Sequence, residues 1–359
     1  MFKFVILIFC FTGQSFAQQK ITDDLKLNVN YHFGYVLPEY QFINYYVNDY
    51  IHSIGVSLFK ERSGKNYWEE IYNYPEHGFS FFYTSLGNDS VFGKEAALTY
   101  DVKFFYVSTK KFKVFNRLGI GIGYASKKFD IKTNYVNVAV GSHFNIHFNF
   151  RLGGSYKLSD KSEFNISASF DHFSNANSGE PNLGMNLLTF SSGLSYRLGA
   201  KSDKKRYELK PHKAKNTFYA FANMGGKHTR SLSTKKYITF STSFQAKRSF
   251  SRMIQLGAGL DLFYDSSIKD QLISNDKTYK SSYSFQTGFH ISQTLVYNNI
   301  WLTLQEGIYI GLLEKVDNYK LYNKLIVGYN IGEHLVINLA MKSHLHILDY
   351  PEIGVGYKF

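Results

Sequence analysis

The sequence predicts an all-β protein that forms a transmembrane antiparallel β-barrel of about 16 strands. Apolar and polar residues alternate along many segments of about ten residues, as they do in strands with one face toward lipid. Aromatic residues make up 18% of the 359 residues, a content that fits aromatic belts at both membrane interfaces better than it fits a soluble β-sandwich. Past the leader, no run reaches the roughly 18 apolar residues of a spanning helix, so strands are expected to cross.

The first residues have the composition of a signal peptide. Lys3 precedes an apolar run at 4–9, and residues 15–17 form the small-x-small motif that signal peptidase recognises. We therefore expect residues 1–17 to be removed and the mature chain to begin at Gln18.

The segment 143–152 shows the strand pattern most clearly. Its lipid-facing positions are apolar: Phe144, Ile146, Phe148, Phe150 and Leu152. The positions between them carry His, Asn and Arg, which a register slip of one residue would expose to lipid. The same period recurs at 254–262 and 335–341, so we expect polar inner faces throughout the barrel.

About eight such runs lie on each side of the basic segment 200–215, which we interpret as a solvated linker. Short turns such as 109–111 and 159–161 alternate with long connections such as 37–48 and 265–280. Short turns are typical of the periplasmic side and long loops of the cell exterior.

Two architectures fit this count, namely two tandem 8-stranded units or one 16-stranded barrel. Residues 192–198 and 353–359 both resemble the closing strand of outer-membrane barrels. Since each half has its own closing strand, we favour two units, at residues 18–199 and 216–359.

Several function classes find no support in the sequence. Cys10, the only cysteine, lies in the leader, which excludes disulfides and thiol catalysis from the mature chain. No phosphate loop, zinc-type spacing or basic aromatic groove is present, so we expect no cofactor, no metal and no nucleic-acid partner. His143 and His147 share the lumen parity, where bonding to polar neighbours is a simpler interpretation than metal binding.

The candidate chemistry lies in one hairpin. Along 164–174 the lipid-facing parity starts with four nonpolar residues and continues to His172 and Ser174. This strand follows a short turn and runs outward, so the pair is predicted near the extracellular rim. Asn186 has the same outward parity at the start of the next strand.

A histidine and a serine two positions apart on one strand can form a nucleophile with its base. Their Cα atoms lie ~6.6 Å apart, a distance that an imidazole leaning along the strand can bridge. The alternative is that His172 and Ser174 are ordinary interfacial polar residues where the lipid band ends.

The hairpin carries two short motifs, His172-Phe-Ser-Asn-Ala176 and Pro181-Asn-Leu-Gly-Met-Asn186. Followed by a closing strand, they resemble the active-site hairpin of the outer-membrane lipid A deacylases, the PagL-type acyloxyacyl hydrolase family. The likeness is clear over this hairpin and weaker along 27–198, so unit 18–199 is the deacylase-like one. Beyond the linker, it extends only to longer relatives with a second barrel-like half.

The resemblance implies a serine esterase in the cell outer membrane that removes an ester-linked acyl chain from lipid A, by 3-O-deacylation of lipopolysaccharide in the outer leaflet. Ser174 would be the nucleophile and His172 the base, while the Asn175 side chain or nearby backbone N–H groups would hold the oxyanion. The barrel assembly machinery is the expected partner in biogenesis.

One position departs from the family pattern. The third catalytic member is typically a glutamate, and Asn186 stands at the matching position. An amide can orient imidazole but brings no negative charge, and replacing the acid of a serine protease triad costs ~10⁴ in turnover. Glu180 could substitute if its loop folds back, whereas Asp171 has lumen parity. A strand-end cap is the alternative interpretation of Asn186.

Two functional hypotheses follow from the sequence. The first is a lipid A deacylase. The second is a non-enzymatic outer-membrane barrel, porin-like or structural, in which the hairpin is a degenerate site.

Overall fold

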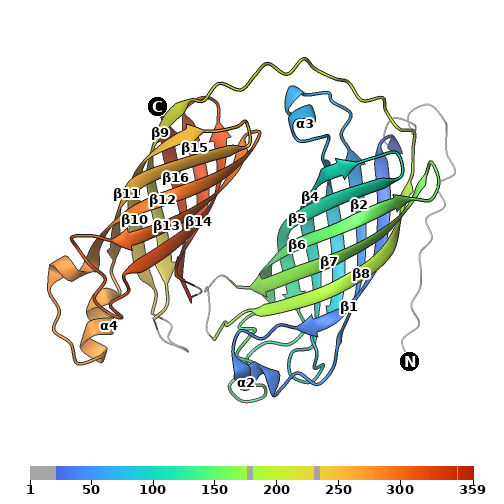
Figure 1. Ribbon diagram of the computed structural model, residues 1–359. Coiled ribbons are helices and arrows are strands. Elements are labelled where there is room, and N and C mark those ends of the chain that lie inside the picture. Colours follow the sequence, from blue (N-terminus) through green and yellow to red (C-terminus); the bar gives the residue numbers. More distant parts are fainter. Residues whose placement is uncertain (1–21, 176–180, 230–234, 346) are drawn as a thin grey trace.

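The computed structural model describes residues 22–175, 181–229, 235–345 and 347–359, which contain two closed antiparallel barrels (Figure 1). The first barrel comprises β1 (Leu25–Val36), β2 (Ile51–Glu61), β3 (Glu76–Ser85), β4 (Lys94–Ser108), β5 (Phe112–Ala125), β6 (Phe144–Lys157), β7 (Ser162–Ser174) and β8 (Met185–Arg197). The second comprises β9 (Asn216–Lys227), β10 (Tyr237–Ser249), β11 (Ile254–Asp265), β12 (Phe285–Tyr297), β13 (Ile300–Tyr309), β14 (Leu321–Ile331), β15 (Leu335–His344) and β16 (Ile347–Lys358). β8 closes on β1 and β16 on β9, which decides for two units and against one wide barrel.

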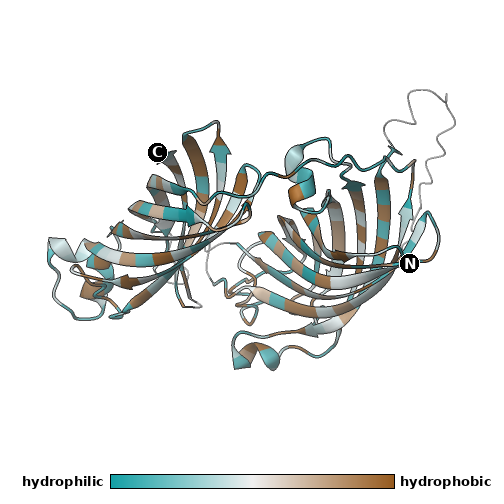
Figure 2. Cartoon of the chain, turned by 45° about the horizontal axis from the view of Figure 1, so that its top comes forward, coloured by the Kyte–Doolittle hydropathy of each residue, from teal (hydrophilic) through white to brown (hydrophobic). Residues whose placement is uncertain are grey.

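The predicted alternation holds along the strands, where hydrophobic and hydrophilic residues succeed each other (Figure 2). In β6, Asn145, His147, Asn149 and Arg151 are buried in the lumen, while the five predicted lipid-facing residues are exposed on the outside. A barrel in a membrane requires a polar interior and an apolar exterior, because lipid surrounds its outer face.

Buried ion pairs fill the lumen of each barrel. Lys26 Nζ lies 2.8 Å from Glu76 in the first, and Lys324 Nζ lies 2.7 Å from Glu352 in the second. A charge inside a small barrel is tolerated only with a partner, since desolvation costs several kcal/mol per ion. Both interiors are therefore packed with side chains.

The connections at one end of the strands are mostly short, as predicted for the periplasmic side. β4 joins β5 through residues 109–111, and β12 joins β13 through 298–299. The exception is the β2–β3 connection, which carries α3 (Tyr67–Ile71). The other end has long loops with α2 (Gln41–Asn44), α4 (Ile268–Ser274) and η1 (Ser281–Ser284), apart from the short β15–β16 turn. None of the helices in the described residues is long and apolar enough to span a membrane.

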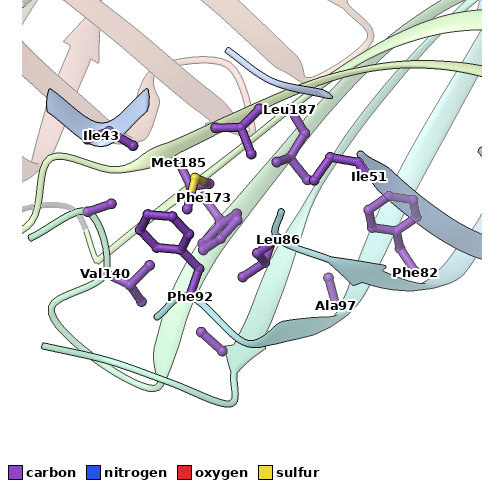
Figure 3. Close-up of a cluster of buried hydrophobic side chains, with 13 residues drawn as sticks. Ile43, Ile51, Phe82, Leu86, Phe92, Ala97, Val140, Phe173, Met185 and Leu187 are labelled. Atoms are coloured by element: carbon purple, nitrogen blue, oxygen red, sulfur yellow. The ribbon is translucent and has the colours of Figure 1, made fainter. Parts of the chain in front are cut away.

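An apolar cluster closes the outer end of the first lumen (Figure 3). Ile43 of α2 and Val140 of the β5–β6 loop meet Phe173 and Leu187 from the candidate hairpin. Burial of such side chains stabilises by roughly 1.5–3 kcal/mol each. The hairpin is thus anchored from inside while its other face stays outward.

The basic segment 200–215 is largely exposed, as expected, but its first half is tied to the first barrel. Ser202 donates to Asp24, and Lys205 N–H donates to the Ser63 carbonyl at 2.7 Å. Tyr74 in turn donates to the Lys205 carbonyl. Charge composition predicts solvation, yet it does not reveal such backbone hydrogen bonds.

Candidate active site

The alternation of β7 places His172 and Ser174 on the outer face of the first barrel. Their neighbours Asp171 and Phe173 point into the lumen and are 0% and 1% exposed, whereas His172 and Ser174 are half-buried. β7 leaves the short β6–β7 turn, so both residues lie at the outer end of the strand. Both side chains therefore lie on the outward face of the barrel, at the end of β7 away from the short β6–β7 turn.

His172, Ser174 and Asn186 form one chain of hydrogen bonds. His172 Nε2 lies 3.2 Å from Ser174 Oγ, and His172 Nδ1 lies 2.6 Å from Asn186 Oδ1. β7 and β8 pair in a register that sets His172 directly opposite Asn186. The strand pairing itself thus brings the third residue to the imidazole.

This arrangement fixes the tautomer of the imidazole. A carbonyl oxygen only accepts, so Asn186 Oδ1 requires the proton on His172 Nδ1. The lone pair of Nε2 then points to the Ser174 hydroxyl, which is the state of a general base next to a nucleophile. What the amide does not supply is negative charge for an imidazolium.

The loop after Ser174 is organised by a second amide. Asn175 is buried, and its backbone N–H donates to Asn182 Oδ1 at 3.1 Å. Sequence reasoning missed this role of Asn182, although Asn182 lies in the motif at residues 181–186. Glu180, the suggested substitute acid, falls outside the described residues.

Gly184 is a further position that sequence reasoning did not single out. Its φ of +78° favours glycine, and a Cβ there would lie 2.8 Å from His172 Cε1. Its N–H donates to the Ala139 carbonyl at 3.0 Å, next to a bond from Leu183 N–H to Val138. The β5–β6 loop therefore holds residues 183–184, just before β8, in place, and the imidazole of His172 packs against Gly184.

The two other candidate histidines, His143 and His147, bond to neighbouring groups of the first barrel. His147 is buried in the lumen, with Nδ1 2.9 Å from Glu95 and Nε2 3.3 Å from Asp171. His143 departs from the prediction of a lumen position, because it precedes β6 and stacks on outward-facing Tyr124 at 5.3 Å. Alternation does not hold where the strand has not yet begun. The described residues contain no group of three ligands suited to a metal ion.

Two family models match this chain. Residues 52–195 match the model described as lipid A 3-O-deacylase (PagL), and residues 216–359 match the model described as acyloxyacyl hydrolase, C-terminal domain. No curated protein matches the chain.

Solved structures resemble parts of the chain at low identity. The outer membrane enzyme PagL is 15% identical, over 46% of this chain and 97% of its own, with a TM-score of 0.35. Neisserial surface protein A is 9% identical, over 48% and 96%, with a TM-score of 0.32. The Pseudomonas putida toluene transporter TodX is 11% identical, over 93% and 87%, with a TM-score of 0.19. With the two models covering both barrels, the chain belongs to the PagL-type acyloxyacyl hydrolase family of outer-membrane lipid A deacylases.

Proposed function

We propose that this protein is an outer-membrane serine esterase that removes an ester-linked acyl chain from lipid A of lipopolysaccharide, by 3-O-deacylation. The observation that carries the proposal is the bonded chain of Ser174, His172 and Asn186 on the lipid-facing side of the outer rim. An acyl ester of an outer-leaflet lipid lies at that depth. The family matches support the same substrate.

In the proposed mechanism, Ser174 Oγ attacks the ester carbonyl while His172 Nε2 takes its proton. The tetrahedral intermediate collapses as the imidazolium returns that proton to the departing sugar oxygen, which leaves as a hydroxyl. Water, deprotonated by the same nitrogen, then attacks the acyl-serine, and the fatty acid leaves as the imidazolium returns the proton to Ser174 Oγ. Each step moves one proton through Nε2, so the Nδ1 bond to Asn186 persists throughout.

The oxyanion is assigned to Asn175 and to backbone N–H groups beside it. Because the Asn175 N–H already donates to Asn182 in this state, its use would require the loop to exchange that bond when substrate enters. Asn186 is assigned to orienting the imidazole, with Glu180 as an alternative acid.

The remaining assignments concern export and organisation. We propose cleavage of a signal peptide at residues 1–17, membrane insertion by the barrel assembly machinery, and no nucleic-acid partner. The boundaries that we propose are a deacylase unit at 18–199, a linker at 200–215 and a second barrel at 216–359.

Mass spectrometry of lipid A tests the proposal. Cells expressing the wild type should lose one hydroxyacyl chain from lipid A, and Ser174→Ala should abolish that loss. Ser192→Ala, at another outward serine, on β8, is the matched control and should retain it. An unchanged spectrum from well-expressed, membrane-inserted wild type would remove the esterase.

The porin-like or structural alternative is not favoured. Buried ion pairs occupy both lumens, and an interior filled by side chains offers a solute no evident path.

A further inference from the structure

Aromatic side chains join the two barrels at their periplasmic ends. The ring of Tyr297, where β12 ends, lies 5.3 Å from Trp68 and 4.6 Å from Tyr72, both in the α3 connection of the first barrel. The Tyr297 hydroxyl bonds His77 Nε2, and the Tyr72 hydroxyl donates to the Val296 carbonyl. We call these residues the junction.

The α3 connection also holds the linker. Tyr207 donates to the carbonyls of Gly64 and Lys65, and its ring meets Tyr67 edge-on at 5.8 Å. The Arg252 guanidinium of the second barrel lies over the Tyr67 ring, 5.4 Å from its centroid. The α3 connection thus contacts both the linker and the second barrel.

Strand tilt determines which side of the first barrel faces the junction. β7 has 13 residues, so it is about 43 Å long and, tilted by about 45°, travels about 30 Å sideways, roughly half the circumference of an eight-stranded barrel. Its outer end therefore lies above the periplasmic end of the strand four places away. That strand is β3, which begins directly after the α3 connection.

The two views agree with this geometry. The outer ends of β7 and β8 point toward the second barrel in Figures 1 and 2. The same reasoning places the outer ends of β16 and β9 above the β12–β13 turn, hence on the side toward the first barrel. The outward side chains there include Met224 and Ile353, which are paired neighbours and exposed.

We propose that the second barrel is a substrate-binding wall, held by the junction opposite the His172–Ser174 face, and that its apolar side chains contact the acyl chains of the lipid substrate. The identity of that substrate rests on the proposed function. This arrangement gives the second barrel a role without chemistry of its own. An acylated lipid between two apolar walls is held at the depth of the serine.

Distances between spin labels test the arrangement without any catalysis. In the full chain, labels at Leu188→Cys and Met224→Cys should lie closer together than labels at Tyr83→Cys and Met224→Cys, by about one barrel diameter. Leu188 and Tyr83 both point outward near the outer rim, on β8 and β3. Cys10, in the proposed leader, is the only native cysteine. Equal distances, or the reverse order, would overturn the proposal.

Steady-state kinetics test whether the second barrel contributes to substrate binding. The double variant Trp68→Ala, Tyr297→Ala should broaden the Leu188–Met224 distance distribution and raise KM for micellar lipid A about tenfold, with kcat within about twofold. Tyr329→Ala, an outward aromatic of β14 outside the junction, should change neither. A broadened distribution with unchanged KM would overturn the substrate role. If the wild type cleaves no lipid A, the esterase fails instead, and the label distances still decide the arrangement.

Discussion

The two barrels share strand number, closure and a polar lumen, and both carry polar side chains on the outward face near the outer rim, among them Asn323 and Glu306 of the second barrel. Among the described residues, however, only the first barrel has a histidine bonded to a serine on that face. In both, the hairpin of the last two strands contains histidine near its outer end. His172 of β7 points outward to Ser174, whereas His344 of β15 points into the lumen, where Nε2 lies 2.8 Å from the Tyr309 hydroxyl. The parity of one residue thus separates an imidazole that faces outward beside a serine from one that is enclosed in the lumen.

The connection between the two strands differs as well. β7 and β8 are joined through residues 175–184, while β15 and β16 are joined through 345–346. The longer loop supplies Asn182 and Gly184, which shape the surroundings of the imidazole. A site on a barrel wall thus depends on outward parity together with a loop long enough to fold back on it.

The largest predicted effect comes from disturbing the packing of the β7–β8 loop against His172, the feature that the second barrel lacks. Gly184→Ala should lower kcat/KM by about 10²-fold, because the new methyl group would press on His172 Cε1, and misplacement by about 1 Å costs that much. Lipid A mass spectrometry and micelle kinetics would measure the loss.

Gly332→Ala is the matched control for backbone strain. Gly332, in the β14–β15 turn, also has a positive φ, of +65°, but a Cβ there meets no atom within 4 Å. Its variant should keep full activity with only a small loss of stability. Equal losses from both glycines would show that strain rather than imidazole packing is responsible.

Asn186→Asp should instead raise activity at the first barrel. A carboxylate of the same length would keep the 2.6 Å bond to His172 Nδ1 and add the charge that stabilises imidazolium. We expect kcat to rise by about tenfold, a part of the ~10⁴ that separates acid from amide in a serine protease triad. A fall in kcat with intact folding would mean that another group, such as Glu180, already serves as the acid.

Much of this comparison could be predicted from the sequence, because the alternation of apolar and polar residues along a strand determines which side chains face outward and which face the lumen. Parity alone places His172, Ser174 and Asn186 outward, and it places His344 and Asp171 inward. It fails at strand ends, as for His143, and it carries no information on contacts between distant segments. The docking of α3 on Tyr297 and the approach of Ala139 to Gly184 arise from tertiary packing.

The smallest predicted effect concerns the second barrel alone. Tyr309→Phe removes the hydroxyl that bonds His344 but keeps the ring, which packs 4.9 Å from Tyr322. Losing one buried hydrogen bond should cost about 1 kcal/mol of stability, measurable by urea unfolding from micelles, with kcat and KM unchanged. If kcat fell instead, the lumen of the second barrel would be coupled to chemistry on the first, and a purely passive wall could no longer account for its presence.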